Sequence, residues 1–264
     1  MDSNDIFSVK RFLMLFRQSL TINMKTIAIS VAGFFGLVFI LLIYLQLTTG
    51  LSGWDNKDSF RVFVFLFFAI GLIYVGMAFP SFRSKGKSIA FLMFPSSTLE
   101  KYLLEFITRI IAFVVLMPLL FWIAANIEGA FIHLWSSSMK DHTFSFNEPV
   151  SKFFSRAPNE QWEIMAFIQG TILAFLAVFA GGAYFSKSPF LKTMFIIMLT
   201  GFGIFLYIHL LGKAFDIDTY GYRRTGILFI KHGNVGAGAF SVLAMIANLS
   251  LLAISWFSLK EKEV

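Results

Sequence analysis

The residues of this chain with the most definite local chemistry lie in the stretch FPSSTLEKYLLEF, residues 94–106. Ser97 is followed three residues later by Glu100. This is the spacing of a capping box, in which the serine hydroxyl caps a helix and the glutamate reaches back to the serine amide. Glu105 and Arg109 lie four residues apart and therefore share a helix face. The stretch predicts a well-defined helix start that carries charged residues.

Side-chain combinations that carry catalysis are absent from the sequence. There is no cysteine, no G-x-x-x-x-G-K-[ST] phosphate-binding loop, no H-E-x-x-H zinc motif and no G-x-S-x-G nucleophile elbow. The four histidines are scattered and have no metal-ligand spacing. We therefore expect neither an enzyme nor a bound metal or cofactor.

Apolar residues dominate the composition. The 264 residues are 57% hydrophobic and 14% charged, whereas a soluble domain has about 25% charged residues. Phenylalanine alone occurs 35 times. A soluble core of this size does not hide so much apolar surface, so the bilayer must act as solvent. The predicted fold class is an all-α, polytopic membrane protein with a single transmembrane domain over residues 1–264.

Six stretches without Asp, Glu, Lys or Arg are about as long as a bilayer-spanning helix. They predict transmembrane helices near residues 27–47, 61–80, 103–126, 163–184, 192–211 and 237–258. The loop between the third and fourth spans, residues 128–162, is long and polar, and we expect short helices or a small cap in it. An even number of spans places both termini on one side of the membrane.

The distribution of charge indicates that this side is the cytoplasm. With both termini inside, the whole net charge of +7 falls on the inner segments. This agrees with the tendency of Lys and Arg to remain on the cytoplasmic side. We interpret the basic charge as a topology signal and an attraction to anionic lipid, and not as a nucleic-acid-binding surface.

The segment before the first span, residues 5–25, predicts an amphipathic helix on the inner membrane surface. Its apolar residues, Phe16 among them, recur at steps of three and four, while Lys10, Arg11 and Arg17 gather on the opposite side. A plain topology anchor and a docking element for a partner protein are equally compatible with this pattern.

The segment between the second and third spans predicts an element that projects from the membrane. Basic residues precede a short apolar run and the capped helix start. One interpretation is an interfacial loop that faces lipid. The other is a docking surface for a cytoplasmic protein, formed by Arg83, Lys85, Lys87, Ser97, Glu100 and Lys101.

This layout resembles the permease subunits of ABC-2-type transporters. The stretches LMFPSSTLEKYLLEF, residues 92–106, and FSLKEKEV, residues 257–264, are similar to a group of small six-span bacterial permeases that pair with a separate ATPase. The resemblance implies a homodimer or a paired permease in the bacterial inner membrane, with a cytoplasmic ABC ATPase that grips the loop after the second span.

In such a permease, residues 83–100 would couple ATP hydrolysis in the partner to movement of the spans. The cargo we expect is hydrophobic or amphipathic, because the span surfaces are apolar and aromatic. The alternative is a non-transporting scaffold or accessory subunit whose outer loop, residues 128–162, holds an envelope partner.

Overall fold

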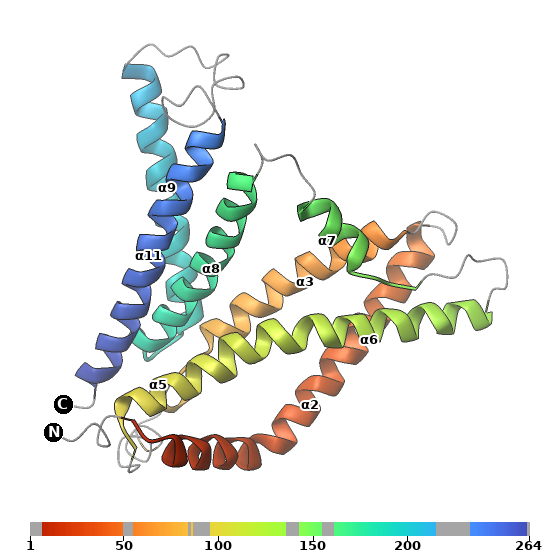
Figure 1. The fold of residues 1–264 in the computed structure, drawn as a ribbon, viewed down its shortest axis with the longest axis horizontal. Helices are drawn as coiled ribbons and strands as arrows, with labels where there is room; N and C mark the ends of the chain where they lie inside the picture. The colour runs from red at the N-terminus through yellow and green to blue at the C-terminus, as the bar shows by residue number, and fades with distance from the viewer. Residues whose placement is uncertain are drawn as a thin grey trace. The chain divides into compact units, whose positions relative to one another are not determined.

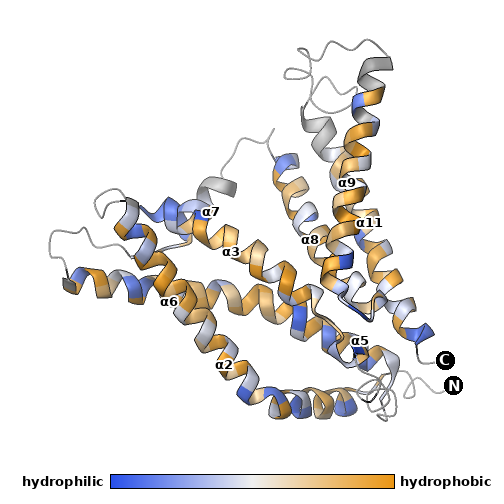
Figure 2. Ribbon diagram, turned by 180° about the vertical axis from the view of Figure 1, so that it is seen from behind, coloured by the Kyte–Doolittle hydropathy of each residue, from blue (hydrophilic) through white to orange (hydrophobic). Residues whose placement is uncertain are grey.

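A computed structural model of the chain describes residues 7–49, 55–83, 86, 96–135, 143–154, 161–214 and 233–262. Every regular element among these residues is a helix, as the composition predicted (Figure 1). Six helices are long and apolar enough to cross a membrane, and Figure 2 shows apolar residues along their length. The chain is an all-α, multi-pass membrane protein.

The helices follow the order of the predicted spans. The long helices are α2 (Val9–Thr49), α3 (Asn56–Gly76), α6 (Ala112–Trp135), α8 (Gln161–Tyr184), α9 (Pro189–Ala214) and α11 (Gly233–Glu261). The short elements are η1 (Pro80–Arg83), α5 (Thr98–Phe106), η2 (Ile107–Ile111) and α7 (Asn147–Phe154). Two helices differ clearly from the predicted spans: α3 begins and ends several residues earlier, and α6 extends well past residue 126.

The chain divides into two compact units. The first comprises residues 1–71 and 95–152, and the second comprises residues 72–94 and 153–264. Helix α3 runs from the first unit into the second.

In the first unit, the predicted surface helix and the first span are parts of one continuous helix, α2. In Figure 1 its first turns run at an angle to the rest. Thr21 Oγ1 donates to the Arg17 carbonyl at 2.8 Å, and Asn23 Nδ2 donates to the Ser19 carbonyl at 2.9 Å. Such bonds to a carbonyl one turn back often bend a helix without ending it. The segment contains neither Pro nor Gly to end it.

The core of the first unit is aromatic. Helices α2 and α6 pack together, with Val38 and Leu42 of α2 completely buried. Phe144 and Phe146 come from the predicted outer loop and pack edge-on against each other, with ring centroids 4.8 Å apart. Phe144 also packs on Phe121 of α6 at 5.3 Å. The expected short helix in this loop is α7, which follows these two rings.

The third span is a composite of α5, η2 and α6. The amide of Ala112 donates to the carbonyl of Ile107, five residues earlier, so η2 is a single π-helical turn. Such turns contain one residue more than the α-helix accommodates. The chain continues through it from Thr98 to Leu134 as one candidate membrane span.

In the second unit, α8 packs along α11 and also against α9. Glycine is required where α8 meets its neighbours, because a Cβ on Gly181 would lie 1.8 Å from Thr193 Oγ1 of α9. At the other end of the chain, Lys262 Nζ donates to the carbonyl of Ala183 and lies 4.7 Å from the ring centroid of Phe82. Burial lowers the pKa of Lys262, whose positive charge suits the C-terminal end of α8.

Candidate functional site

The helix start at Ser97 has the structure that its sequence predicted. Ser97 has an extended backbone, with φ −69° and ψ 153°, and its hydroxyl accepts a hydrogen bond from the Glu100 amide at 3.3 Å. In return, Glu100 Oε2 accepts from the Ser97 amide at 3.2 Å. The capping box is confirmed, and it fixes the backbone where the chain enters α5.

Glu100 also binds the N-terminal end of α2. Its Oε1 accepts hydrogen bonds from the Ser8 amide at 2.8 Å and from Arg11 Nε at 3.2 Å. Ser8 directly precedes α2, and its carbonyl accepts from the Phe12 amide, which is the first bond of that helix. One carboxylate therefore lies at the N-terminal ends of two helices, where both helix dipoles favour a negative charge.

We call Ser8, Arg11, Ser97 and Glu100 the Glu100 junction. The Glu100 side chain is completely buried in it, and Lys101 beside it is almost completely buried. Both side chains are therefore shielded from solvent in this conformation, and their role in docking a partner protein stays a prediction.

The structure describes the basic part of that predicted docking surface incompletely. Arg83 is exposed at the end of η1 and belongs to the second unit. Lys85 and Lys87 lie outside the described residues. The structure thus brings Ser97 and Glu100 together with Arg11, whereas the grouping of the three basic residues with them stays a prediction.

The residues predicted for the membrane-surface helix lie on the first turns of α2. Lys10 and Arg17 are exposed, and Phe16 is half-buried against Phe12, with ring centroids 6.4 Å apart. Large apolar side chains of the same turns, such as Leu13, are exposed as well. Apolar side chains left uncovered by protein are what a helix lying against lipid requires, but the position of these turns at the membrane surface stays a prediction.

The second charged pair predicted for α5 is also present. Arg109 Nε lies 3.4 Å from Glu105 Oε2, and both side chains are partly shielded from solvent. This pair joins α5 to the π-turn η2, because Arg109 is one of the residues of that turn. It contributes little stability by itself, since pairs of this spacing give about 0.2–0.5 kcal/mol.

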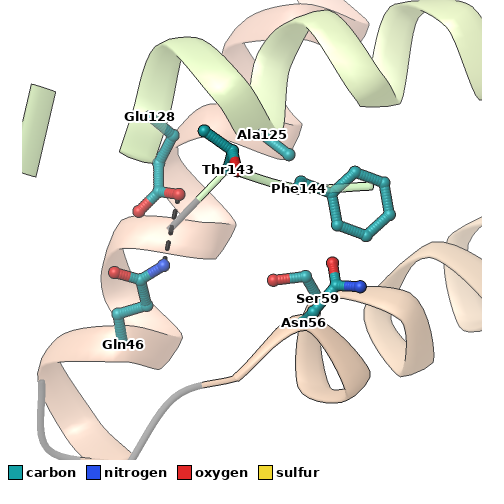
Figure 3. A pocket seen from close by; sticks show the side chains of 7 residues that line it. All are labelled: Gln46, Asn56, Ser59, Ala125, Glu128, Thr143 and Phe144. Carbon is teal, nitrogen blue, oxygen red and sulfur yellow. Dashed lines mark hydrogen bonds between the residues drawn. The ribbon is translucent and has the colours of Figure 1, made fainter. Parts of the chain in front are cut away.

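A second buried carboxylate, Glu128, was missed by the sequence interpretation. The predicted third span ended at residue 126, which assigned Glu128 to the outer loop, but α6 continues to Trp135 and the residue is 2% exposed. Gln46 Nε2 of α2 donates to Glu128 Oε2 at 3.2 Å (Figure 3). The sequence did contain a signal for this pair. Gln46 and Glu128 each lie alone in a long apolar stretch, and polar residues in such stretches normally face the protein interior.

Within the part of the chain that the structure describes, no three His, Asp or Glu side chains gather as ligands of a divalent metal. Two buried carboxylates, those of Glu100 and Glu128, lie in this part of the chain. Comparison of the chain with protein-family models, with curated proteins and with solved structures gives no match.

Proposed function

We propose that the chain is the permease subunit of an ATP-driven transporter of the ABC-2 type, in the bacterial inner membrane, with both termini in the cytoplasm. A separate cytoplasmic ATPase binds the segment between the second and third spans. Two copies, or two paired permeases, form the path of a hydrophobic or amphipathic cargo. This chain carries no catalysis of its own.

The observation that supports this proposal best is the Glu100 junction. Through one buried carboxylate, the N-terminal end of α2 is held to the helix start that follows the segment between the second and third spans. A partner that displaces this segment therefore moves α2 and the composite third span together. Such a rigid connection is what transmission of a nucleotide-driven movement into the membrane requires.

The proposed sequence of events follows from that connection. ATP binding by the partner shifts the segment of residues 83–100, and the capping box at Ser97 transfers the shift to α5. The bonds from Glu100 to Ser8 and Arg11 transfer it to α2. The two spans then tilt as one body against those of the second permease, which opens a route for the cargo.

The alternative, an accessory subunit of an envelope complex, is supported by a fixed segment within the predicted outer loop. Asn56 Nδ2 donates to the Ser145 carbonyl at 2.9 Å, and the Ser145 amide donates to Asn56 Oδ1 at 3.2 Å. This reciprocal pair holds the start of the segment with α7 against the start of α3. A fixed element of this kind is suited to holding a partner.

Isolation of the tagged full chain in mild detergent, followed by mass spectrometry and an ATPase assay, separates the two functions. The permease proposal expects a stoichiometric ATPase whose hydrolysis rate changes when the permease is present. Combined reversal of the three loop charges, R83E with K85E and K87E, is expected to reduce its recovery at least tenfold.

A matched control reverses three basic residues of the predicted outer loop, with K140E, K152E and R156E, and is expected to leave the ATPase bound. If the ATPase is recovered equally with both triple variants, the loop after the second span does not bind it. If envelope proteins are recovered without an ATPase, and only the control variant loses these envelope proteins, the accessory-subunit alternative is established.

A further inference from the structure

The surroundings of Glu128 leave half of its carboxylate without a partner. Oε2 accepts the hydrogen bond from Gln46, but Oε1 is buried and has no hydrogen-bond partner among the described residues. Buried polar atoms are nearly always paired, so an unpaired carboxylate oxygen in a native fold calls for a specific explanation.

A cavity opens beside this carboxylate, within the first unit (Figure 3). Its volume is ≈ 10 Å³, which is close to the room that one water-sized particle needs. Most of its lining side chains carry an oxygen atom; the lining residues are Gln46, Asn56, Ser59, Ala125, Glu128, Thr143 and Phe144. The cavity is therefore lined by several oxygen-bearing side chains.

Among the residues that the structure describes, no lysine, arginine or histidine lines the cavity. The negative charge of Glu128 is thus opposed only by the amide dipole of Gln46 in the part of the chain that the structure describes. A buried carboxylate without a compensating charge is strongly disfavoured. A water molecule in the cavity would supply a hydrogen bond to Oε1 but no charge, so the deficit points to a cationic guest.

The kind of cation follows from the ligands. Oxygen atoms select hard cations, and a single carboxylate gives one negative charge, which matches a monovalent ion better than a divalent one. A proton on Oε1 would also neutralise the charge, but it would leave the cavity unfilled. A small alkali cation satisfies the charge and fills the space.

We propose that Glu128, Gln46, Ser59 and Thr143 form a binding site for one sodium ion. The site lies where four parts of the first unit meet: the last turns of α2, the first turn of α3, helix α6, and the segment that begins at Thr143. An ion bound there holds four parts of the first unit to one another. The proposal concerns this cavity alone and stands apart from the proposed transport function.

The test measures binding of ²²Na⁺ to the purified full chain in detergent micelles at constant ionic strength, with choline chloride replacing sodium chloride. Wild-type protein is expected to bind close to one ion per chain, saturably, and to unfold at a higher temperature in sodium than in choline. E128Q is expected to lose at least tenfold in ²²Na⁺ affinity and to lose the difference between the two salts.

Two further variants keep the test decisive. E163Q neutralises an exposed glutamate at the start of α8 in the second unit and is expected to bind ²²Na⁺ as the wild type does. S59A removes one oxygen from the cavity without changing charge and is expected to weaken binding several-fold, which serves as the test if E128Q does not fold.

Absence of saturable ²²Na⁺ binding to the wild type would overturn the proposal. Undiminished binding in both E128Q and S59A would also overturn it, because the ion would then be held elsewhere. If sodium and choline stabilise the protein equally and only acidification raises its unfolding temperature, a proton rather than sodium neutralises Glu128, and the proposal is overturned.

Discussion

Two glutamates of the first unit are buried to a similar degree, yet their surroundings differ in one respect. Glu100 accepts hydrogen bonds at both oxygens, from the amides of Ser8 and Ser97 and from the Arg11 guanidinium. Glu128 accepts at one oxygen only, from an uncharged amide. The comparison shows that burial alone does not determine how fully a carboxylate is satisfied, because the number and the charge of the hydrogen-bond donors differ between the two residues.

The largest effect is expected for Glu100→Gln. The amide of glutamine matches the carboxylate in shape but directs an NH₂ group at donors that now lack an acceptor, so we expect a loss of about 3 kcal/mol in the free energy of unfolding. Titration with SDS of the purified protein, followed by circular dichroism, measures it. Hydrogen exchange at the amides of Ser8 and Ser97 should rise in the same variant.

A loss below about 0.5 kcal/mol for Glu100→Gln would contradict this view of Glu100, because the junction would then contribute no more stability than an ordinary surface pair. The matched control is Glu105→Gln, which removes the pair with Arg109. It is expected to change the free energy of unfolding by no more than about 0.5 kcal/mol.

A smaller effect is expected for Gln46→Leu in sodium-free medium. This change removes the donor to Glu128 Oε2, and a buried acceptor left without its donor destabilises the fold by about 2 kcal/mol. In the double variant, Gln46→Leu with Glu128→Leu, both polar partners are replaced, and stability should return close to that of the wild type. The double-mutant cycle measures the coupling of the two side chains.

The same substitution that destabilises at Glu100 is expected to stabilise at Glu128. In sodium-free medium, Glu128→Gln removes an uncompensated charge and keeps an oxygen for the bond from Gln46, so unfolding should require about 1 kcal/mol more. The measurement is again SDS titration, in choline chloride. A destabilisation as large as that of Glu100→Gln would show that the two glutamates are equivalent after all.

The smallest effect is expected for Arg11→Gln. The Arg11 side chain is 40% exposed, so solvent screens its attraction to Glu100, and a loss below about 1 kcal/mol is expected. Comparison with Glu100→Gln in the same SDS titration separates the contribution of the guanidinium from that of the two backbone amides. Equal losses in the two variants would assign the stability of the junction to the arginine.

The elements that could be predicted from the sequence are those set by local pattern. The long apolar runs gave the number and order of the membrane helices, because their length is fixed by the bilayer. The capping box was visible because Ser97 and Glu100 lie three residues apart. The end of α6 was placed too early, because a single charged residue was taken as the end of an apolar run that in fact continues to Leu134.

The contacts that define the two carboxylate sites could not be predicted in the same way. Ser8 and Glu100 are separated by 92 residues, and Gln46 and Glu128 by 82. No periodicity within one helix reports which residue of another helix lies opposite. The polarity of these side chains indicated that they needed partners, but the partners followed only from how α2 packs against α5 and α6.

The π-turn η2 has a consequence for how the third span tolerates changes of length. Because that turn holds one residue more than an α-helix accommodates, deletion of one residue between Ile107 and Ile111 allows the turn to become α-helical while α5 and α6 keep their relative orientation. Deletion of a residue later in α6 turns everything beyond it by about 100° around the helix axis, which carries Glu128 away from Gln46. Gain or loss of single residues over evolutionary time is therefore expected to concentrate at this turn.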